Sequence, residues 1–331
     1  MQSLAAVTGA EGFIGSHLVE ALVRRGTPVR AMVLYNAFNS WGWLDTLPPD
    51  VLANVEVVPS DLRDASAVGE FMREVEVVYH LGALIAIPWS YRAPRSYLDT
   101  NAGGTLNILE AARSLGTTRV VHTSTSEVYG TARTVPIAEN HPLQAQSPYS
   151  ASKIAADKLA EAYHLSFGVP VATLRPFNTY GPRQSARAVI PTIITQLAAN
   201  QTALRLGLLT PTRDFNFVAD TVAAFLAVAD APADAVVGRV FNAGSGAEIT
   251  IGDLAAKIAR LMSCEIEFVE EPERLRPEAS EVQRLLADSA CLREATGWSP
   301  THPLDDGLRV TIDWFRRPEN LARYKWSGFT L

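Results

Sequence analysis

Residues 4–26, LAAVTGAEGFIGSHLVEALVRRG, decide the fold of this 331-residue chain. They form a short apolar strand pattern, a turn containing Gly9, Gly12 and Gly15, and a helical pattern that closes on Gly26. Strand, glycine turn and helix in this order are the context of a dinucleotide-binding fingerprint, although the spacing is GxxGxxG rather than GxGxxG. Glycines let the backbone approach a pyrophosphate, and a helix N-terminus favours its charge. The stretch therefore predicts a Rossmann-type unit that binds a dinucleotide.

Strand and helix patterns alternate through the first half of the chain. After the glycine turn, apolar runs typical of buried strands occur at residues 28–36, 55–64, 75–83, 119–125 and 169–176. Two long helical patterns cover residues 93–116 and 148–168. This alternation predicts an α/β protein with a parallel, doubly wound sheet.

From about residue 175 the pattern changes, because proline and polar residues become frequent. We expect helices at 189–200, 218–230 and 250–262, and strands at 238–244 and 265–270. We assign residues 1–178, with a returning segment at about 215–246, to the dinucleotide-binding domain. Residues 179–214 and 247–331 are then a smaller C-terminal α/β domain that binds the substrate.

Composition narrows the class of protein. The net charge is −6 and there is no basic run, so we expect no nucleic-acid partner. Cys264 and Cys291 are the only cysteines, which argues against a disulfide framework and for a reducing compartment. The N-terminus enters a strand directly, and no run approaches the ~18 apolar residues of a membrane helix. We predict a cytoplasmic protein with no membrane association and no metal site.

A second stretch carries chemistry: HTSTSEVYG at 122–130, followed after eighteen residues by YSASK at 149–153. Tyr149 and Lys153 stand four apart, so on a helix they share one face. The Lys153 ammonium would stabilise a Tyr149 phenolate and lower a phenol pKa that is ordinarily about 10. A hydroxyl from Thr125 would hold a substrate oxygen beside that phenol. Together the three residues predict a base that takes the proton of a sugar alcohol, unless the pattern is a chance pairing.

The sequence of the predicted dinucleotide-binding domain does not fully define which dinucleotide is bound or which residues contact it. An acid is expected at the end of the second strand to bind the adenosine ribose, but Leu34, Tyr35 and Asn36 occupy that place. Because neither an acid nor an adjacent arginine is present, we predict NAD with Asn36 as a ribose contact. The loop at 36–48 contains two tryptophans and is either tucked against the core or a lid over the adenine. We expect His80 to be a packed or hydrogen-bonded core histidine.

Several motifs together resemble the extended short-chain dehydrogenase/reductase family of nucleotide-sugar epimerases and dehydratases. They are TGAEGFIGSHL, HLGA, TNAGGTLNIL, TSTSEVYG, PYSASK, RPFNTYGPRQ, TRDFNFVAD, FNAGSG and RPEASEVQRLLAD ahead of GWSP. The resemblance implies a catalytic set of Thr125, Ser126, Glu127, Tyr149 and Lys153. It implies NAD contacts from Gly9, Gly12, Phe13, Ile14, Gly15, Asn36, Asp61, Leu62, Leu81, Ala83, Asn101, Tyr149 and Lys153. It implies substrate contacts from Asn178, Arg183, Arg213 and Arg276, with the three arginines holding the diphosphate.

Within that family the residues after the triad hydroxyl separate the activities. Sugar 4,6-dehydratases carry Thr-Asp-Glu or Thr-Ser-Glu, whereas C4-epimerases usually lack the Glu, and this chain has Thr125-Ser126-Glu127. The resemblance therefore implies a 4,6-dehydratase, a lyase in which Glu127 removes the C5 proton. With Ser126 in place of Asp, either Glu127 also protonates the departing C6 hydroxyl or a water intervenes. The structural alternative is that Glu127 forms only a salt bridge.

More narrowly, NAFNSWGWLDTLP, ALIAIPWSY, STSEVYGTA and RQSARAVIPTIITQ resemble NAD-dependent 4,6-dehydratases of the legionaminic-acid type of pathway. That likeness implies UDP- or GDP-N-acetylglucosamine as substrate. The wider family resemblance implies a homodimer formed by the two long helices, whose Ala-rich faces also suit burial within one chain. Two rival functions stay open: a C4-epimerase acting on a hexosamine or a uronic acid, and a non-catalytic NAD-binding protein.

Overall fold

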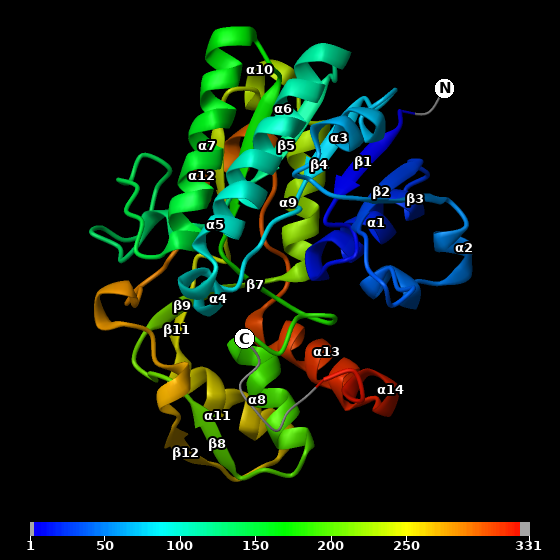
Figure 1. Ribbon diagram of the computed structural model, residues 1–331. Coiled ribbons are helices and arrows are strands. Elements are labelled where there is room, and N and C mark those ends of the chain that lie inside the picture. Colours follow the sequence, from blue (N-terminus) through cyan, green and yellow to red (C-terminus); the bar gives the residue numbers. More distant parts are fainter. Residues whose placement is uncertain (1–2, 325–331) are drawn as a thin grey trace.

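The computed structural model describes residues 3–324, and its central layer is a seven-stranded sheet (Figure 1). The strand order is β10-β6-β5-β4-β1-β2-β3, and every neighbouring pair is parallel. In chain order the strands are β1 (Ala5–Thr8), β2 (Val29–Leu34), β3 (Val55–Ser60), β4 (Val77–His80), β5 (Arg119–Thr123), β6 (Val171–Pro176) and β10 (Val240–Ala243). The predicted doubly wound α/β fold is confirmed.

Helices cover both faces of this sheet. Helices α3 (Ala65–Phe71), α6 (Gly104–Leu115) and α7 (Pro148–Phe167) pack side by side on one face, and α1 (Phe13–Arg24) packs with α9 (Val218–Asp230) on the other. The β1 residues AAVT are all buried, as expected for a parallel strand covered on both faces. The strand order reverses between β1 and β4, and open α/β sheets bind ligands beyond the carboxyl ends of the strands at such a point.

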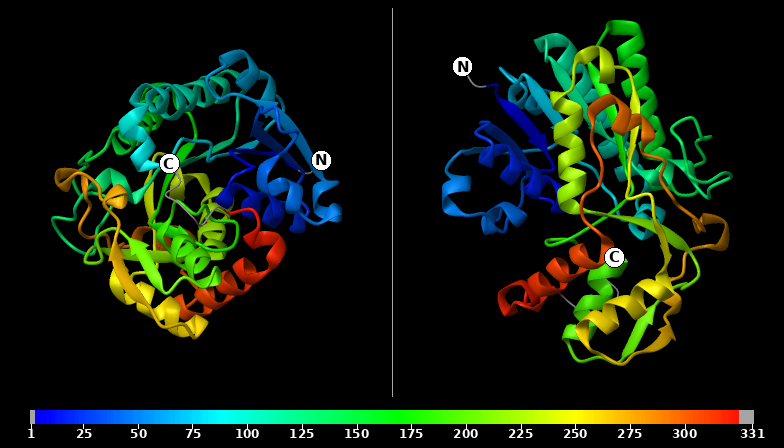
Figure 2. Two further views of the ribbon diagram at one scale, coloured as in Figure 1. Left: turned by 60° about the horizontal axis from the view of Figure 1, so that its bottom comes forward. Right: turned by 180° about the vertical axis from the view of Figure 1, so that it is seen from behind.

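The smaller part of the molecule lies below the carboxyl edge of this sheet in Figures 1 and 2. Its strands form two sheets: β11 (Glu248–Thr250), β9 (Thr212–Phe217) and β7 (Asn178–Tyr180) in one, β12 (Glu267–Glu270) and β8 (Ala203–Leu206) in the other. Its main helices are α8 (Val189–Ala198), α11 (Ile251–Met262) and α13 (Leu304–Arg316). Helix α11 is capped at its N-terminus, because the Thr250 side chain accepts a hydrogen bond from the Asp253 amide.

Short elements connect these parts. They are α2 (Pro49–Leu52), α4 (Ile87–Arg92), α5 (Pro94–Tyr97), α10 (Ala233–Val236), α12 (Ala290–Thr296) and α14 (Pro318–Leu321), with 3-10 turns at Gly42–Thr46, Ser126–Tyr129, Pro272–Arg274 and Glu278–Ser280. Residues 288–289 and α12 return to the large sheet: the Asp288 amide donates to Ile137 O, Gly244 N donates to Ser289 Oγ, and α12 packs on β10. This short stretch therefore packs with the dinucleotide-binding part, although the sequence pattern assigns all of 247–331 to the substrate-binding domain.

The helix predicted at 93–116 is interrupted. It consists of α5, a π-helical turn at Leu98–Gly103, and α6. The wide turn carries Asn101, whose side chain bonds the backbone N–H and C=O of Leu84 at 2.8 and 2.9 Å. A π-turn inside a helix commonly marks a functional position, and here it presents one amide to the neighbouring loop.

The tryptophan loop links the two parts of the molecule. The Trp43 ring lies edge-on to Trp314, with centroids 5.5 Å apart, and stacks on Tyr324 at 6.1 Å. Of the two interpretations of this loop, Trp43 fits the tucked one, while Trp41 stays 40% exposed. Between residues 3 and 324, no helix is long and apolar enough to cross a membrane.

Candidate active site

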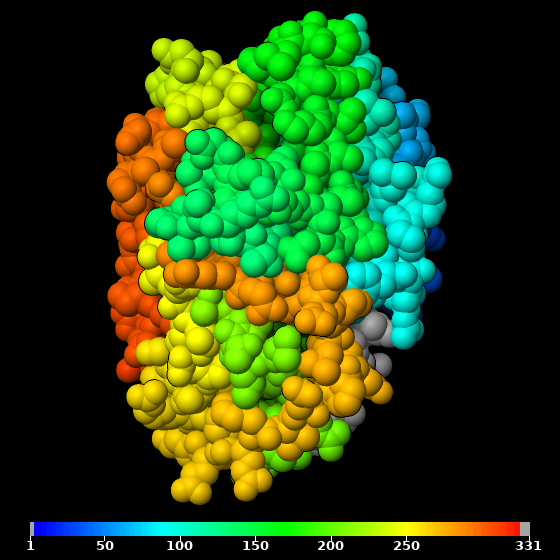
Figure 3. Space-filling model, turned by 90° about the vertical axis from the view of Figure 1, so that its left-hand side faces the viewer, coloured from blue at the N-terminus to red at the C-terminus, as the bar shows by residue number. Residues whose placement is uncertain are grey.

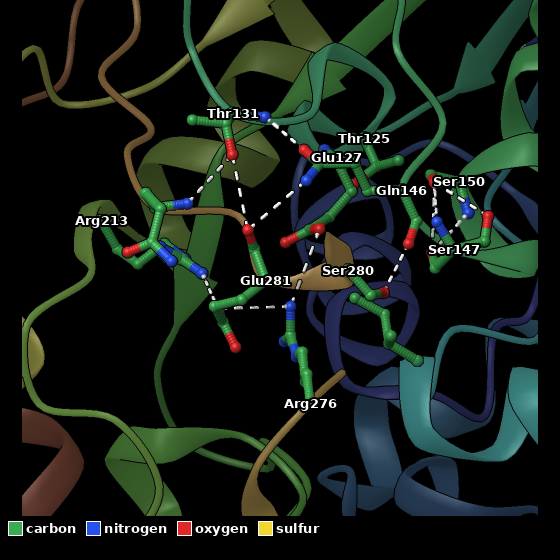
Figure 4. A network of polar contacts seen from close by, with 12 residues as sticks. Thr125, Glu127, Thr131, Gln146, Ser147, Ser150, Arg213, Arg276, Ser280 and Glu281 are labelled. Atoms are coloured by element: carbon green, nitrogen blue, oxygen red, sulfur yellow. Dashed lines mark hydrogen bonds and ion pairs between the residues drawn. The ribbon is translucent and has the colours of Figure 1, made fainter. Parts of the chain in front are cut away.

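The turn after β5 positions a hydroxyl and a carboxyl side by side. Thr125 precedes the 3-10 turn Ser126–Tyr129, and its Oγ1 accepts a hydrogen bond of 3.2 Å from the Glu127 amide. Ser126 is buried at the start of this turn. Figure 4 shows Thr125 and Glu127 together on the turn, with the Glu127 side chain directed toward Arg276. The local geometry thus places both side chains beyond the carboxyl end of the sheet.

Tyr149 and Lys153 lie in the first turns of α7. Ser147 and Ser150 form a capping box there, and Pro148 occupies the first helical position, which fixes where the helix begins. Tyr149 and Lys153 are both buried, and the Tyr149 phenol is hydrogen-bonded to the Thr125 side chain. The three residues predicted to act together therefore meet in one place.

The acid–base balance of this group differs from the prediction. Burial raises the pKa of Tyr149; the hydrogen bond from Thr125 lowers it, and the charge of Glu127 raises it further. Lys153 Nζ donates to Thr123 O at 2.6 Å, and burial lowers the pKa of Lys153 to about 8, against the opposing effect of Asp157. The predicted lowering of the phenol pKa by Lys153 is wrong for this structure, because burial outweighs it.

A run of hydrogen bonds between uncharged groups, which we call the neutral chain, connects the glycine turn with Tyr149. It passes through Thr8, His80, Thr105, Asn101, Ser152 and the backbone C=O of Tyr149, with distances of 2.6–3.0 Å. Burial lowers the pKa of His80 far below its ordinary value, so the ring is neutral. Thr105 donates to Asn101 O and therefore accepts from His80 Nε2–H, which leaves Nδ1 to accept from Thr8. His80 is the hydrogen-bonded core histidine that we predicted.

Asp157 lies beneath Lys153 in a buried ion-paired group. It accepts hydrogen bonds from Ser124 Oγ at 2.8 Å, His122 Nε2 at 3.2 Å and Arg175 Nη2 at 2.8 Å. Although burial raises the pKa of Asp157, these partners hold it at about 2. The carboxylate is therefore charged throughout the working pH range and ties α7 to β5 and β6.

Four charged side chains, which we call the charged cluster, gather near the turn after β5 (Figure 4): Glu127, Arg213, Arg276 and Glu281. Glu281 Oε1 accepts from Arg213 Nη2 at 3.1 Å and lies 3.8 Å from Arg276 Nη1, which is 4.0 Å from Glu127 Oε2. Burial lowers the pKa of Arg213 in spite of the nearby Glu127 carboxylate. Arg276 thus makes only long ion pairs to the two carboxylates.

The segment that carries Arg276 and Glu281 crosses the face shown in Figure 3. Tyr91 Oη and Ser280 Oγ are 2.6 Å apart, Ser280 Oγ also donates to Gln146 O, and Gln146 Nε2 donates to Ala279 O. These contacts join the segment to α4 and to the residues just before α7. The backbone of this segment therefore holds Arg276 and Glu281 close to the start of α7, the helix that carries Tyr149.

Other predicted site residues lie elsewhere. Arg183 Nη2 pairs with Glu20 on α1 at 2.9 Å, so it does not join Arg213 and Arg276 in the charged cluster. Asn36 uses its amide within its own loop, to Leu34 O at 3.3 Å and Ser40 O at 2.8 Å. The side-chain amide of Asn101 is engaged by Leu84 and Ser152, which makes it a positioning group.

The remaining predicted residues lie at the carboxyl edge of the sheet. Asp61 accepts hydrogen bonds from the Arg63 amide and side chain just after β3, followed by the buried Leu62. Leu81 and Ala83 follow β4. Asn178 begins β7, and its Oδ1 is buried without a hydrogen-bond partner among residues 3–324. These positions surround the strand-order reversal, where a ligand is expected.

The glycine turn has the form that a dinucleotide pyrophosphate needs. Gly9 has φ +65°, and a Cβ on Gly15 would lie 2.1 Å from Gly9 O, so no larger residue fits there. Within the described chain, no side chain caps the N-terminus of α1 and no acid lies in its first turn. The amides of Phe13, Ile14 and Gly15 therefore remain available for an anion, and the turn fits the predicted cofactor.

Sequence reasoning missed Glu281 and Asp157 as members of the site, and Glu11 as a partly buried carboxylate in the glycine turn. Asp157 carried a signal, since it stands one turn after Lys153 on the same helical face. Glu281 is close to Arg276 in sequence, but its contact with Arg213 joins residues 68 positions apart. No local pattern indicates such a contact.

Comparison with known proteins agrees with this geometry. The family described as GDP-mannose 4,6 dehydratase matches residues 6–311, and the chain belongs to that family. The UDP-glucose 4-epimerase of Mycolicibacterium smegmatis is 34% identical over 326 residues, which cover 94% of this chain and 97% of that protein. The predicted membership of the extended short-chain dehydrogenase/reductases that act on nucleotide sugars is confirmed.

Solved structures show the same fold along the whole chain. A double mutant of the dTDP-glucose 4,6-dehydratase of Streptomyces venezuelae, with NAD bound, has a TM-score of 0.83 at 27% identity and covers 95% of this chain and 97% of its own. The UDP-glucuronic acid 4-epimerase of Bacillus cereus, in complex with UDP-glucuronic acid and NAD, has a TM-score of 0.85 at 26% identity and covers 95% and 99%. Both a dehydratase and an epimerase thus resemble the chain closely.

Proposed function

We propose that the protein is an NAD-dependent 4,6-dehydratase of a nucleotide sugar, with UDP- or GDP-N-acetylglucosamine as substrate. One observation carries the proposal. Glu127 stands on the same 3-10 turn as Thr125, its amide donates to Thr125 Oγ1, and its charge raises the pKa of the Tyr149 phenol, so a second proton acceptor lies near Tyr149. Removal of a proton at C5 needs such a group beside the one that handles the C4 hydroxyl.

The cofactor assignment rests on the fit of the glycine turn. The free amides at the start of α1 would bind the pyrophosphate, and the edge formed by Leu81, Gly82 and Ala83 would support the nicotinamide half. NAD, when bound, would supply a hydride acceptor for C4 and a hydride donor for C6. Side chains of the protein carry out the proton transfers and bind the substrate.

Tyr149 takes the proton of the C4 hydroxyl. Thr125 hydrogen-bonds the phenol, and Lys153 contributes a positive charge one helical turn away. Because burial opposes ionisation of Tyr149, the phenol releases its proton only where positive charge is gathered around it. Asp157 keeps α7, and therefore both residues, in register with β5.

Glu127 then takes the C5 proton, which the C4 ketone makes acidic. Water leaves from C6, hydride returns to C6, and a proton returns to C5, so the product is the 4-keto-6-deoxy sugar and no net oxidation occurs. Ser126, buried beside Glu127, lacks an acidic proton, so we assign the protonation of the leaving hydroxyl to Glu127 itself. The carboxyl group formed at C5 deprotonation is then the proton donor at C6.

Arg213 and Arg276 bind the diphosphate of the substrate. Guanidinium groups suit phosphate oxygens, and Arg276 makes only long contacts with the protein carboxylates, so it can exchange them for a stronger partner. We assign the sugar-nucleotide site to the smaller part of the molecule, residues 179–214 and 247–331 apart from the returning stretch 288–296. Arg183 faces α1 instead, on the cofactor side.

We also propose that two copies associate through α6 and α7. Leu115, Leu165 and Phe167 are exposed there, at 46%, 76% and 49%. Large apolar side chains gathered on two helices favour burial against another protein surface. The free thiols of Cys264 and Cys291 support a cytoplasmic location.

The mass of the product tests the function. Incubation with UDP- or GDP-N-acetylglucosamine should give a product lighter by one water, about 18 Da. The identity to a UDP-glucose 4-epimerase favours C4 epimerisation as the second candidate, which would give a product of unchanged mass with an inverted C4. Absence of turnover with both nucleotide sugars, in protein shown to bind NAD, would leave a non-catalytic NAD-binding protein.

A further inference from the structure

Glu11 lies in the middle of the glycine turn, yet its side chain points to another strand. Its Oε1 accepts a hydrogen bond of 2.9 Å from the backbone amide of Leu34, the last residue of β2. The carboxylate therefore stands at the carboxyl end of β2, although β2 itself ends without an acid. An acid at that place ordinarily binds the adenosine ribose of a dinucleotide.

The loop after β2 covers Glu11 closely. The Trp43 amide donates to Glu11 O at 3.0 Å, and a Cβ on Gly42 would lie 2.7 Å from the same oxygen. The second carboxylate oxygen, Oε2, is buried and has no hydrogen-bond partner within the described residues. Burial raises the pKa of Glu11 for the same reason. A buried acceptor without a donor is costly, so the position is short of one hydrogen-bond donor.

No neighbouring side chain at the end of β2 serves the ribose instead. The Asn36 amide nitrogen is used by Leu34 O and Ser40 O, and its oxygen accepts from the Phe38 amide. The Tyr35 side chain is 77% exposed. After the next strand, Asp61 forms an ion pair with Arg63. The pair engages the carboxylate that could bind the ribose and also the nearest arginine that could bind a 2′-phosphate. Glu11 is thus the carboxylate at this position.

We propose that Glu11 accepts a hydrogen bond from the adenosine ribose and sets the preference of the protein for NAD over NADP. The proposal rests on the proposed function, since it requires a nicotinamide dinucleotide in the glycine turn. A ribose hydroxyl supplies the missing donor. A 2′-phosphate supplies no donor and brings negative charge against a partly buried carboxylate, which repels it. The discriminating acid is then carried by the glycine turn rather than by β2.

Equilibrium binding tests this role without turnover. Purified protein, freed of bound nucleotide, is titrated with NAD⁺ and with NADP⁺ by calorimetry. We expect the wild type to prefer NAD⁺ by about 100-fold or more, and Glu11→Gln to reduce that ratio at least about tenfold. Glu56→Gln is the matched control, because Glu56 is an exposed acid near the start of β3 that pairs with Arg30 at the opposite edge of the sheet. It should leave the ratio unchanged.

Each outcome separates the two proposals. Wild-type protein that binds neither nucleotide contradicts the proposed function, and wild-type protein that prefers NADP⁺ contradicts the role of Glu11. An unchanged ratio in folded Glu11→Gln also overturns that role. If circular dichroism shows that this variant does not fold, wild-type protein is titrated with NAD⁺ lacking the adenosine 2′-hydroxyl or the 3′-hydroxyl. Loss of one of them should weaken binding about tenfold, and equal affinity for all three nucleotides overturns the proposal.

Discussion

The neutral chain and the charged cluster both approach Tyr149 and are built in opposite ways. The neutral chain consists of short hydrogen bonds of 2.6–3.0 Å among buried, uncharged groups. The charged cluster contains full charges, and Arg276 lies 3.8 and 4.0 Å from its two carboxylates. A satisfied neutral network fixes a position, whereas long ion pairs leave charges ready for a new partner. We therefore infer that the neutral chain positions α7, whereas the charged cluster can exchange its long ion pairs for contacts with a ligand.

The largest effect should come from the residue between the two regions. Tyr149→Phe removes the hydroxyl that takes the C4 proton, and kcat should fall at least about 10³-fold. The phenyl ring keeps the edge-on packing against Tyr97, so folding and nucleotide binding should persist. Steady-state kinetics and calorimetry check both halves of this expectation. Retention of more than about a tenth of the activity would remove Tyr149 from the chemistry.

A second buried group, outside both regions, also holds α7 in place: the ion-paired Asp157, one turn after Lys153, which we remove next. Asp157→Ala leaves the buried Arg175 without its carboxylate, and the free energy of unfolding should fall by about 3–5 kcal/mol. Chemical denaturation measures this. Asp230→Ala is the control, because its pair with Arg25 is exposed to solvent and should contribute about 0–1 kcal/mol. Equal losses in the two variants would show that burial does not decide the outcome.

The substitution Arg276→Met tests whether the charged cluster binds the substrate. The substrate diphosphate loses one guanidinium, so KM should rise about 10–100-fold with a smaller change in kcat. Arg284→Met is the matched control on the same segment, since Arg284 pairs with Glu248 and is half exposed. Raising the salt concentration should weaken substrate binding to the wild type more than to Arg276→Met. If kcat falls instead and KM stays constant, Arg276 serves the transition state rather than binding.

The substitution Asn101→Ala interrupts the neutral chain, and we expect a smaller loss of activity than for Tyr149→Phe. The loop at Leu84 and the Ser152 hydroxyl each lose a partner, which should cost about 1–3 kcal/mol of stability and about tenfold in kcat. KM for the sugar nucleotide should not change, because the charged cluster is untouched. Asn54→Ala, which removes an exposed turn contact, should affect neither quantity. A change in KM with constant kcat would contradict a positioning role.

The smallest effect concerns pH. Lys153 has a pKa lowered to about 8 by burial, so its ammonium is present below that pH and is lost above it. Because a neutral amine gives the phenolate no support, kcat/KM should decline above about pH 8. A pH–rate profile checks this, and Lys153→Arg, which stays charged, should lack the decline. If Lys153→Arg shows the same decline above about pH 8, the decline is caused by the titration of another residue.

Local patterns predicted most of the fold. The strand, glycine turn and helix around Gly9, and the pair Tyr149 and Lys153, depend on residues a few positions apart, and the structure places them as expected. The short strands β7, β8, β9 and β11 were not predicted, because three to six residues carry too little periodicity. The interruption at Asn101 depends on a partner, Leu84, that the sequence does not indicate.

The electrostatics of the site could be predicted only in part. The direction of the Tyr149 pKa was wrong, because spacing along a helix reports the neighbour Lys153 but not the burial of the phenol. Arg183, which resembles a diphosphate ligand by motif, pairs with Glu20 on α1. The acid missing from the end of β2 is supplied by Glu11, which becomes visible only when the turn is folded. The pKa of Tyr149, the partner of Arg183 and the position of the Glu11 carboxylate all depend on contacts between residues far apart in the sequence.

Exchange at C5 tests the central claim, that Glu127 removes a carbon-bound proton beside the Tyr149 phenol. The reaction is run with UDP- or GDP-N-acetylglucosamine in deuterated water, and the product is examined by nuclear magnetic resonance and mass spectrometry. A dehydratase should yield a sugar that has lost water and carries deuterium at C5, and Glu127→Gln should form neither while C4 is still oxidised to the ketone. A product that keeps the C5 hydrogen of the substrate, or full dehydration by Glu127→Gln, would contradict the claim.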